Sequence, residues 1–237
     1  MLLHTKQYGG GSKRIALIHG VSGDHRMFHD LTDRLTARDY TVIGVDLRGH
    51  GESPHVDSYE ISDFADDLVE TLPRGLDVVV GHSLGGVVLI EAVERLQPKR
   101  AIYLDPAWFV PSAFDEAAQH ANVGEHPDGS PYSLDELAGL NPGRGRENLV
   151  RAQHSHERWD ATMLPKLGRL VGQRHVTQVP PPVPSLVVLA AESPLMPGYP
   201  QQQLIEQGYE ICVQPQAGHN LHLDDADATM DALSGWL

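Results

Sequence analysis

The 237-residue sequence has little cysteine, few basic residues and no long hydrophobic run. Its single cysteine, Cys212, excludes an intrachain disulfide and favours a reducing compartment, so we expect the protein in the cytoplasm. Lys and Arg number 18 against 32 Asp and Glu, which gives a net charge of -14. Such an acidic chain repels the phosphate backbone of nucleic acid, so we expect no nucleic-acid partner. No apolar stretch approaches the roughly 18 residues of a membrane helix, and the N-terminal segment lacks the pattern of a signal peptide.

What the sequence does have is a regular alternation of strand and helix patterns. Short, almost entirely apolar runs are typical of strands buried on both faces, and these occupy 15–18, 41–45, 77–80, 101–104, 185–191 and 209–213. Helical patterns lie between or after them, at 28–35, 61–72, 84–96, 200–207 and 225–237. The order predicts an α/β fold: a mostly parallel sheet of about seven strands with helices on both faces.

The alternation stops between residues 106 and 184. This stretch holds helical patches without a convincing strand, including a capping box at Ser133–Glu136 and a long polar helix expected over 147–170. We therefore predict a core formed by 1–105 and 185–237, with 106–184 inserted as a mostly helical cap, or lid. Movement of this cap would gate the active site.

The strongest chemical signal is Gly81-His82-Ser83-Leu84-Gly85-Gly86, which contains the pattern G-x-S-x-G. It directly follows the predicted strand 77–80 and opens the predicted helix 84–96. In such a sharp turn the glycines avoid side-chain collisions, and the serine hydroxyl projects from the sheet edge toward the positive end of the helix. This context predicts that Ser83 is a nucleophile.

With this motif the sequence resembles the α/β-hydrolase superfamily, and three further segments carry the resemblance. His19-Gly20-Val21-Ser22-Gly23 lies where the family has its first oxyanion-hole loop. The segment from Asp46 to Ser53 looks like the family's D-x-R-G-x-G-x-S turn, and Ala217-Gly218-His219-Asn220-Leu221 lies where the family carries its catalytic histidine. The resemblance covers 15–105 and 185–237 and is nearest to small esterases, C–C hydrolases and haloperoxidase-like proteins with a helical cap.

A serine hydroxyl needs a base near neutral pH, and a neutral histidine suits that role. Of the fourteen histidines, His219 follows the last predicted strand, at the sheet edge beside Ser83, so we predict that it is the base. We interpret His222 as a surface or capping histidine near the terminal helix. The histidines within the glycine motifs are interpreted as groups that fix loops: His19, His50 and His82.

The acid of the triad departs from the usual pattern of the superfamily. Most relatives carry an aspartate after the strand that is here 185–191, but this chain has Glu192 there, with a serine about where the aspartate is expected. Asp105 ends the strand before it, a position that some members use, and it keeps the order serine, acid, histidine. We favour Asp105 and keep Glu192 as the alternative acid.

The resemblance also implies two backbone N–H groups that hold the oxyanion of the reaction. These are the N–H groups of Leu84 and Val21, with that of Ser22 as the alternative if the loop is one residue out of register. Trp108 and Phe109, just beyond the sheet edge, either line a substrate pocket or join the cap to the core, and both interpretations stay open.

No metal or cofactor is expected. His154 and His156 are two residues apart, so they point to different faces of the predicted helix, and no third ligand has zinc spacing. Signatures for pterin, flavin, nicotinamide and pyridoxal cofactors are absent, and the chemistry of a serine triad needs none of them.

The sequence therefore predicts a serine hydrolase that acts on an ester or other acyl substrate through a Ser-His-Asp triad and an acyl-enzyme. Alternatives on the same triad are C–C bond hydrolysis, lactone hydrolysis and cofactor-free peroxidation. A different class is a binding protein with a hydrolase fold, although such proteins typically lose a triad member. The expected partner is a small acyl molecule, with no nucleic acid and no membrane. The sequence indicates neither the acyl group nor the oligomeric state.

Overall fold

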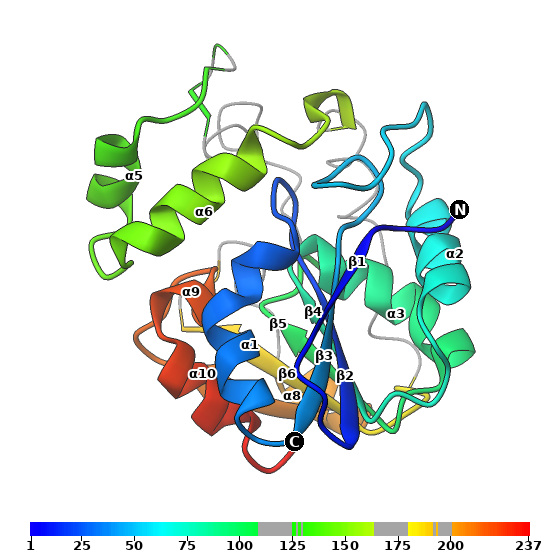
Figure 1. The fold of residues 1–237 in the computed structure, drawn as a ribbon. Helices are drawn as coiled ribbons and strands as arrows, with labels where there is room; N and C mark the ends of the chain where they lie inside the picture. The colour runs from blue at the N-terminus through cyan, green and yellow to red at the C-terminus, as the bar shows by residue number, and fades with distance from the viewer. Residues whose placement is uncertain (109–124, 127, 129, 164–179, 192, 194–200) are drawn as a thin grey trace.

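The computed structural model describes residues 1–108, 125–126, 128, 130–163, 180–191, 193 and 201–237. Seven strands in this part of the chain form one sheet (Figure 1). They are β1 (Thr5–Tyr8), β2 (Lys13–Ile18), β3 (Tyr40–Val45), β4 (Val78–His82), β5 (Arg100–Leu104), β6 (Ser185–Ala190) and β7 (Glu210–Gln214). Their order is β1-β3-β2-β4-β5-β6-β7, and all neighbours are parallel except β1 and β3. The predicted fold class is confirmed.

Helices cover both faces of this sheet (Figure 1). One face is covered by the 3-10 helix η1 (His25–Phe28) and by α1 (His29–Thr36), α9 (Leu221–Asp224) and α10 (Ala226–Leu233). The opposite face is covered by α2 (Ile61–Thr71), α3 (Leu84–Leu96) and α8 (Gln201–Glu206). Helices α1, α2, α3, α8 and α10 were expected from the sequence, whereas η1 and α9 were not, and α10 ends four residues before the end of the chain.

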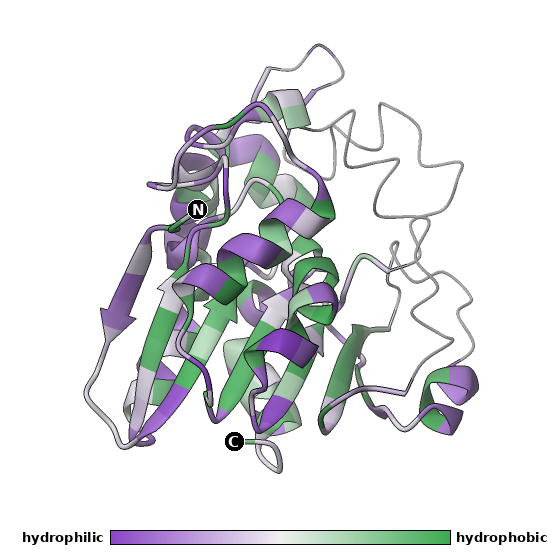
Figure 2. Ribbon diagram, turned by 90° about the vertical axis from the view of Figure 1, so that its right-hand side faces the viewer, coloured by the Kyte–Doolittle hydropathy of each residue, from purple (hydrophilic) through white to green (hydrophobic). Residues whose placement is uncertain are grey.

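Successive side chains of each central strand enter two different cores. In β4, Val79 packs in the core beneath α2 and α3, whereas Val78 and Val80 pack in the core beneath α1 and α10. All three are at most 2% exposed. Figure 2 shows the result as green central strands between helices that are purple only in part. An almost entirely apolar run is therefore the correct signature for these strands.

Strand β1 was not predicted from the sequence. It pairs antiparallel with β3 at the edge of the sheet, where Thr5 lies opposite Val45. Its residues, Thr-Lys-Gln-Tyr, are polar and mostly exposed, and its arrow is purple in Figure 2. A polar edge strand protects the sheet from pairing with another chain, and for the same reason it lacks an apolar signal.

Between β5 and β6 the structure describes α5 (Leu134–Leu140), α6 (Arg146–His156) and the 3-10 helix η2 (Ala161–Met163). The predicted capping box is present: the hydroxyl of Ser133 accepts the N–H of Glu136 at 3.3 Å, and the Glu136 carboxylate accepts the N–H of Ser133 at 2.8 Å. In the described part of this segment no strand occurs, only an isolated bridge between Glu125 and Pro131.

The long helix predicted over 147–170 is wrong, because α6 ends at His156. The chain turns there and buries Trp159, which is 7% exposed. The hydroxyl of Tyr59 then donates to the carboxylate of Asp160 at 2.5 Å. Burial of a large aromatic side chain outweighs the extension of a polar, exposed helix. Beyond residue 163, the rest of that range lies outside the described residues.

None of the helices in the described ranges combines the length and the apolar character that a membrane-spanning helix needs.

Candidate active site

Ser83 and Asp105 stand next to each other at the carboxyl edge of the sheet. The register pairs His82, the last residue of β4, with Leu104, the last residue of β5, so the residues that follow them are neighbours. The N–H of Ser83 donates to the carbonyl of Leu104 at 3.1 Å and fastens the two strand ends together. Loops at this edge of a parallel sheet are the usual place for ligands and reacting groups.

The turn at Ser83 has the strained geometry that its motif predicts. Ser83 has φ 51° and ψ -116°, in a region that side chains rarely adopt and that costs on the order of 1–3 kcal/mol. A Cβ on Gly81 would lie 2.5 Å from the carbonyl oxygen of Gly85, and one on Gly20 would lie 2.9 Å from Cβ of Ser83. Glycine at these positions lets three backbone segments meet around the hydroxyl.

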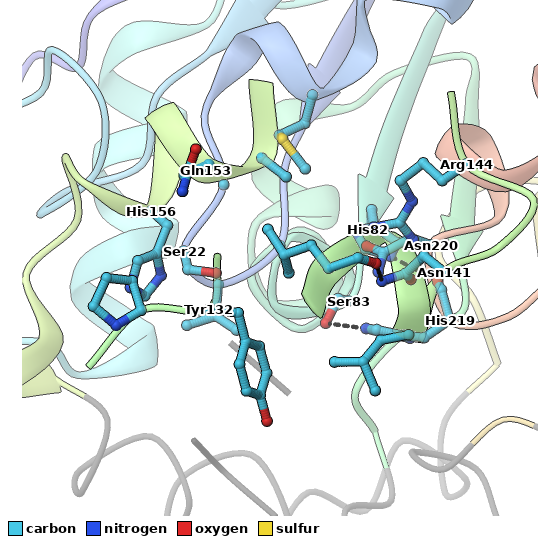
Figure 3. Close-up of a pocket in the computed structure, with 18 residues that line it drawn as sticks. Ser22, His82, Ser83, Tyr132, Asn141, Arg144, Gln153, His156, His219 and Asn220 are labelled. Atoms are coloured by element: carbon cyan, nitrogen blue, oxygen red, sulfur yellow. Dashed lines mark hydrogen bonds between the residues drawn. The ribbon is translucent and has the colours of Figure 1, made fainter. Parts of the chain in front are cut away.

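His219, in the loop after β7, lies between these two residues. Its Nε2 is 2.9 Å from Oγ of Ser83 (Figure 3), and its Nδ1 is 2.7 Å from Oδ2 of Asp105. With the proton on Nδ1, the ring donates to the carboxylate and leaves Nε2 to accept the hydroxyl proton. The three residues that the sequence singled out are thus joined in one hydrogen-bonded chain.

The carboxylate of Asp105 is fully buried and is held by two further donors. Its Oδ1 accepts the N–H of Ala190 at 3.1 Å, and its Oδ2 accepts the hydroxyl of Ser193 at 2.8 Å. Asp105 itself has φ 38°, a second strained residue at a strand end. The alternative acid, Glu192, lies outside the described residues.

Two backbone N–H groups beside Ser83, those of Val21 and Leu84, donate to no acceptor within the described part of the chain. Val21 lines the same cavity as Ser83, and Leu84 is the first residue of α3. The N–H of Ser22, by contrast, donates to Nε2 of His50 at 3.3 Å. This contact favours Val21 over Ser22 as the second donor to an oxyanion.

Two buried histidines hold the loop that carries Val21. Both donate through Nδ1 to a backbone carbonyl, at 2.7 Å for His19 and 2.9 Å for His50. Through Nε2, His19 accepts the N–H of Leu47 at 3.0 Å, and His50 accepts that of Ser22 at 3.3 Å. A ring that both donates and accepts must be neutral. Burial lowers the pKa of His19 and takes the pKa of His50 to about 3, so both stay neutral.

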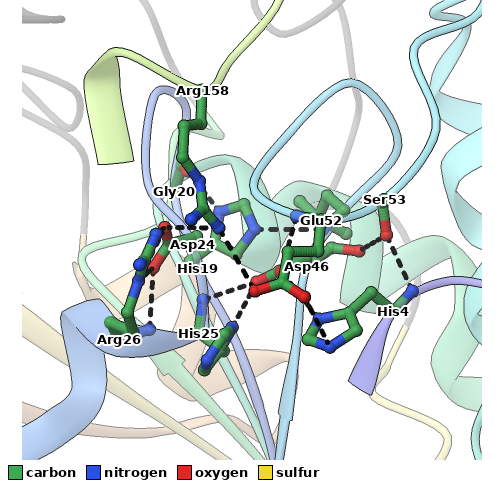
Figure 4. A network of polar contacts seen from close by, with 11 residues as sticks. His4, His19, Gly20, Asp24, His25, Arg26, Asp46, Glu52, Ser53 and Arg158 are labelled. Atoms are coloured by element: carbon green, nitrogen blue, oxygen red, sulfur yellow. Dashed lines mark hydrogen bonds and ion pairs between the residues drawn. The ribbon is translucent and has the colours of Figure 1, made fainter. Parts of the chain in front are cut away.

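Asp46 is the centre of a second polar network behind this loop (Figure 4). Its Oδ1 accepts the backbone N–H of His25 and lies 2.8 Å from Nδ1 of the same residue. Its Oδ2 lies 2.9 Å from Nδ1 of His4 and accepts the backbone N–H of Glu52. Burial raises the pKa of Asp46, but these hydrogen bonds outweigh it and hold the pKa below its usual range. In the described ranges, His4, His25 and Asp46 are the group close enough to share a metal ion. Because four N–H groups already occupy the carboxylate, we assign the network to holding the loops.

The prediction that His222 is a surface or capping residue is wrong. It is 2% exposed, it stacks on Phe28 at 4.5 Å between ring centroids, and it meets the ring of His82 at 4.7 Å. Helix α9 is a single turn that packs inward, which explains this burial. Nε2 of His82 is 2.9 Å from the carbonyl oxygen of His219, so His82 fixes a loop as expected. Burial lowers the pKa of both rings, that of His222 to about 3.

Trp108 packs in the core and is not among the described residues that line the cavity beside Ser83, which favours the interpretation that it joins the cap to the core. Its side chain is 1% exposed, and its indole N–H donates to the carbonyl of Gly86 at 3.3 Å. Its ring packs against Tyr103 at 4.8 Å and Tyr209 at 5.7 Å between centroids. Phe109 lies outside the described residues.

A cavity of about 310 Å³ opens onto Ser83 and His219 (Figure 3). One wall comes from the loop 20–23, and another comes from residues between 131 and 156, including both α5 and α6. Sequence reasoning placed this insertion near the site and named Trp108 and Phe109 from it as pocket candidates, but none of the residues between 131 and 156. The insertion contributes Pro131, Tyr132, Leu137, Leu140, Asn141, Arg144, Ala152, Gln153 and His156.

Curated relatives match only part of the chain. The 2-(acetamidomethylene)succinate hydrolase of Mesorhizobium japonicum is 41% identical over 87 residues, which are 35% of this chain and 31% of the relative. A pimeloyl-[acyl-carrier protein] methyl ester esterase of Neisseria meningitidis serogroup B is 39% identical over 83 residues, again 35% of this chain and 31% of the relative. The matched region therefore spans about a third of these relatives' length.

Solved structures match along the whole chain. An N-formylmaleamic acid deformylase from Pseudomonas putida S16 has a TM-score of 0.78 at 22% identity, covering 98% of this chain and 95% of that one. An E-2-(acetamidomethylene)succinate hydrolase has a TM-score of 0.77 at 24% identity, covering 99% and 94%. At these identities the likeness concerns the fold. The model of the alpha/beta hydrolase family matches residues 15–232, nearly the entire sequence, and the chain belongs to that family.

Proposed function

We propose that the protein is a serine hydrolase that cleaves an ester or another acyl compound, with Ser83, His219 and Asp105 as its catalytic triad. The observation that carries the proposal is the hydrogen-bonded chain of these residues, at 2.9 Å and 2.7 Å, beside an open cavity of about 310 Å³. A hydroxyl, an imidazole and a buried carboxylate in this order form the constellation that acyl transfer requires.

In the first half of the reaction, Nε2 of His219 accepts the hydroxyl proton while Oγ of Ser83 attacks the acyl carbon. The resulting imidazolium is stabilised by the carboxylate of Asp105, which stays ionised. The oxyanion that forms accepts hydrogen bonds from the N–H groups of Val21 and Leu84, a contribution of about 3–4 kcal/mol per donor in related chemistry. His219 then returns the proton to the leaving group, which departs and leaves an ester on Ser83.

In the second half, His219 takes a proton from water, and the hydroxide attacks the acyl-enzyme carbonyl. Collapse of the second tetrahedral intermediate returns the proton to Oγ of Ser83 and releases the acid. We propose that 106–184 acts as the cap of this site and limits its access to water. The contribution of α5 and α6 to the cavity wall supports that role.

The names of the two partial relatives support an acyl substrate. One relative is named as a hydrolase of 2-(acetamidomethylene)succinate, and another as a methyl ester esterase. Both names describe hydrolysis, the second that of a carboxylic ester, which the arrangement around Ser83 would serve without a cofactor.

The test uses the substitution Ser83→Ala and an activated ester, 4-nitrophenyl acetate. The variant should keep the far-ultraviolet circular dichroism of the parent and lose activity by on the order of 10³-fold or more, because triad members act as a unit. A fluorophosphonate probe should label the parent on Ser83 and leave the variant unlabelled. Activity within tenfold of the parent, or an unlabelled parent protein, contradicts the proposal.

A further inference from the structure

The cavity beside Ser83 has a charge character opposite to that of the chain. The protein carries 32 acidic residues and a net charge of -14, yet none of the 18 described residues that line the cavity is an aspartate or a glutamate. The lining does include Arg144 and several groups that can donate hydrogen bonds. In an acidic protein, a cavity whose described lining holds an arginine and no carboxylate favours an anion over a cation or a neutral apolar ligand.

Arg144 is the permanent positive charge in this lining. Its side chain is only 6% exposed, and it lies on the side of His219 and Asn220 in Figure 3. Oδ1 of Asp224 accepts from its Nε at 3.2 Å and from its Nη2 at 2.8 Å. Oδ2 of Asp224 in turn accepts the N–H of Gly218, next to His219, at 3.0 Å. The guanidinium is therefore fixed in place relative to the triad.

Asp224 occupies only one edge of this guanidinium. A guanidinium has five N–H donors, of which Asp224 uses one on Nε and one on Nη2. Within the described part of the chain, Nη1 of Arg144 has no acceptor. The remaining edge, formed by Nη1 and the second proton of Nη2, has the spacing that binds a carboxylate through two parallel hydrogen bonds.

The cavity lining that includes Arg144 also includes uncharged side chains that can form hydrogen bonds. Asn141 donates through its amide to the carbonyl of Leu137 at 2.9 Å, which fixes its orientation at the C-terminal end of α5. Asn220, adjacent to His219, makes no side-chain hydrogen bond within the described ranges. A carboxylate near Arg144 would have such amide donors close by.

We propose that the substrate carries a free carboxylate and that Arg144 binds it while the acyl carbon faces Ser83. This inference rests on the proposed function and adds the substrate class to it. In the free enzyme Asp224 balances the charge of Arg144, so binding adds a second carboxylate to a guanidinium that is already oriented. A cavity of about 310 Å³ suits a small acid, at the lower end of the sizes that ligand sites have.

The test compares two methyl esters of the same shape, monomethyl succinate and methyl 4-methylpentanoate, in which two methyl groups replace the carboxylate oxygens. Hydrolysis is followed in a pH-stat. The parent enzyme should have a kcat/KM at least tenfold higher for monomethyl succinate. Arg144→Gln should lose on the order of 10²-fold with monomethyl succinate, mostly through KM, and at least ten times less with the neutral ester. Arg146→Gln, which removes an exposed charge from the start of α6, is the matched control and should keep both activities.

A second measurement does not depend on either ester being a good substrate. Free succinate should inhibit hydrolysis of 4-nitrophenyl acetate competitively, with an inhibition constant at least tenfold lower for the parent than for Arg144→Gln. Equal inhibition constants, or equal losses with the two methyl esters, overturn the carboxylate proposal while the serine hydrolase stands. If 4-nitrophenyl acetate is not hydrolysed and Ser83 is not labelled by a fluorophosphonate, the proposed function itself has failed.

Discussion

The hydroxyl of Ser193 donates to Oδ2 of Asp105 at 2.8 Å, the same oxygen that lies 2.7 Å from Nδ1 of His219. Ser193 follows β6, where most relatives carry the triad acid according to the resemblance, and Asp105 follows the neighbouring strand β5. The two positions thus share one hydrogen-bonded site. The carboxylate of Asp105 comes from the end of β5, and the hydroxyl of Ser193 that donates to it comes from the chain after β6.

The first prediction moves the carboxylate from residue 105 to residue 193. Asp105→Asn should lower kcat for 4-nitrophenyl acetate by roughly 10³- to 10⁴-fold, because an amide favours the wrong tautomer of His219. Adding Ser193→Asp to that variant should recover at least tenfold, since a carboxylate then reaches the same ring nitrogen from the other strand. Glu192→Gln is the control and should cost less than tenfold. A large loss in Glu192→Gln with little loss in Asp105→Asn would identify Glu192 as the acid.

The second prediction concerns the buried ion pair between Arg48 and Asp67. Nε of Arg48 donates to Asp67 at 2.6 Å, and their side chains are 9% and 1% exposed. Asp67→Asn should lower the free energy of unfolding by about 3 kcal/mol, because it removes the buried carboxylate of this pair and leaves Arg48 only the more exposed Asp63 as its ionic partner. Asp66→Asn, one residue earlier, removes the exposed partner of Arg95 and should cost under about 1 kcal/mol. Urea unfolding measures both, and equal effects would contradict the argument.

Much of the fold was predictable because its signals are local. Residues 15–18 and 78–80 are apolar throughout, which is typical of a strand buried on both faces. The polar strand β1 carried no such signal, because its stability comes from pairing with β3. The end of α6 was missed because Trp159 is buried by distant parts of the chain, which helical periodicity does not reveal.

The residues of the hydrogen-bonded chain were also predictable, but the cavity wall was not. Ser83, Asp105 and His219 each follow a strand, and the parallel sheet brings strand ends to one edge. Arg144 had no comparable signal, because its place depends on how α5 and α6 pack over that edge and on its partner Asp224, 80 residues away. His222 was misjudged because its burial depends on Phe28, from a different part of the chain.

The third prediction tests the loop that carries Val21. His50→Leu removes the acceptor of the Ser22 N–H, so the loop loses one of the contacts that orient Val21 toward Ser83. We expect kcat to fall by about 10- to 100-fold with little change in KM, less than the loss of an oxyanion donor itself. His55→Leu, at an exposed position of the same turn, should leave kcat unchanged. A change in KM alone would place the role of His50 in substrate binding.

The last prediction concerns acid stability and the buried ring of His222. Burial lowers its pKa to about 3, so the folded protein does not take up this proton at mildly acidic pH, whereas the unfolded chain does so near pH 6.5. A lowered histidine pKa therefore destabilises the folded state as the pH falls below about 6.5, by about 2 kcal/mol between pH 7 and pH 5. Nδ1 of this ring is buried without a hydrogen-bond partner in the described part of the chain, so an apolar ring removes the cost.

Between pH 7 and pH 5, the free energy of unfolding of His222→Phe should therefore fall by about 2 kcal/mol less than that of the parent. Urea unfolding at each pH measures this difference. The comparison within each protein cancels any constant cost of fitting the larger ring against Phe28. The matched control is His29→Phe, because the side chain of His29 is 43% exposed on α1, and its loss between the two pH values should equal that of the parent. If His222→Phe and the parent lose the same stability, the ring of His222 takes up its proton in the folded protein, and its burial does not set the acid sensitivity.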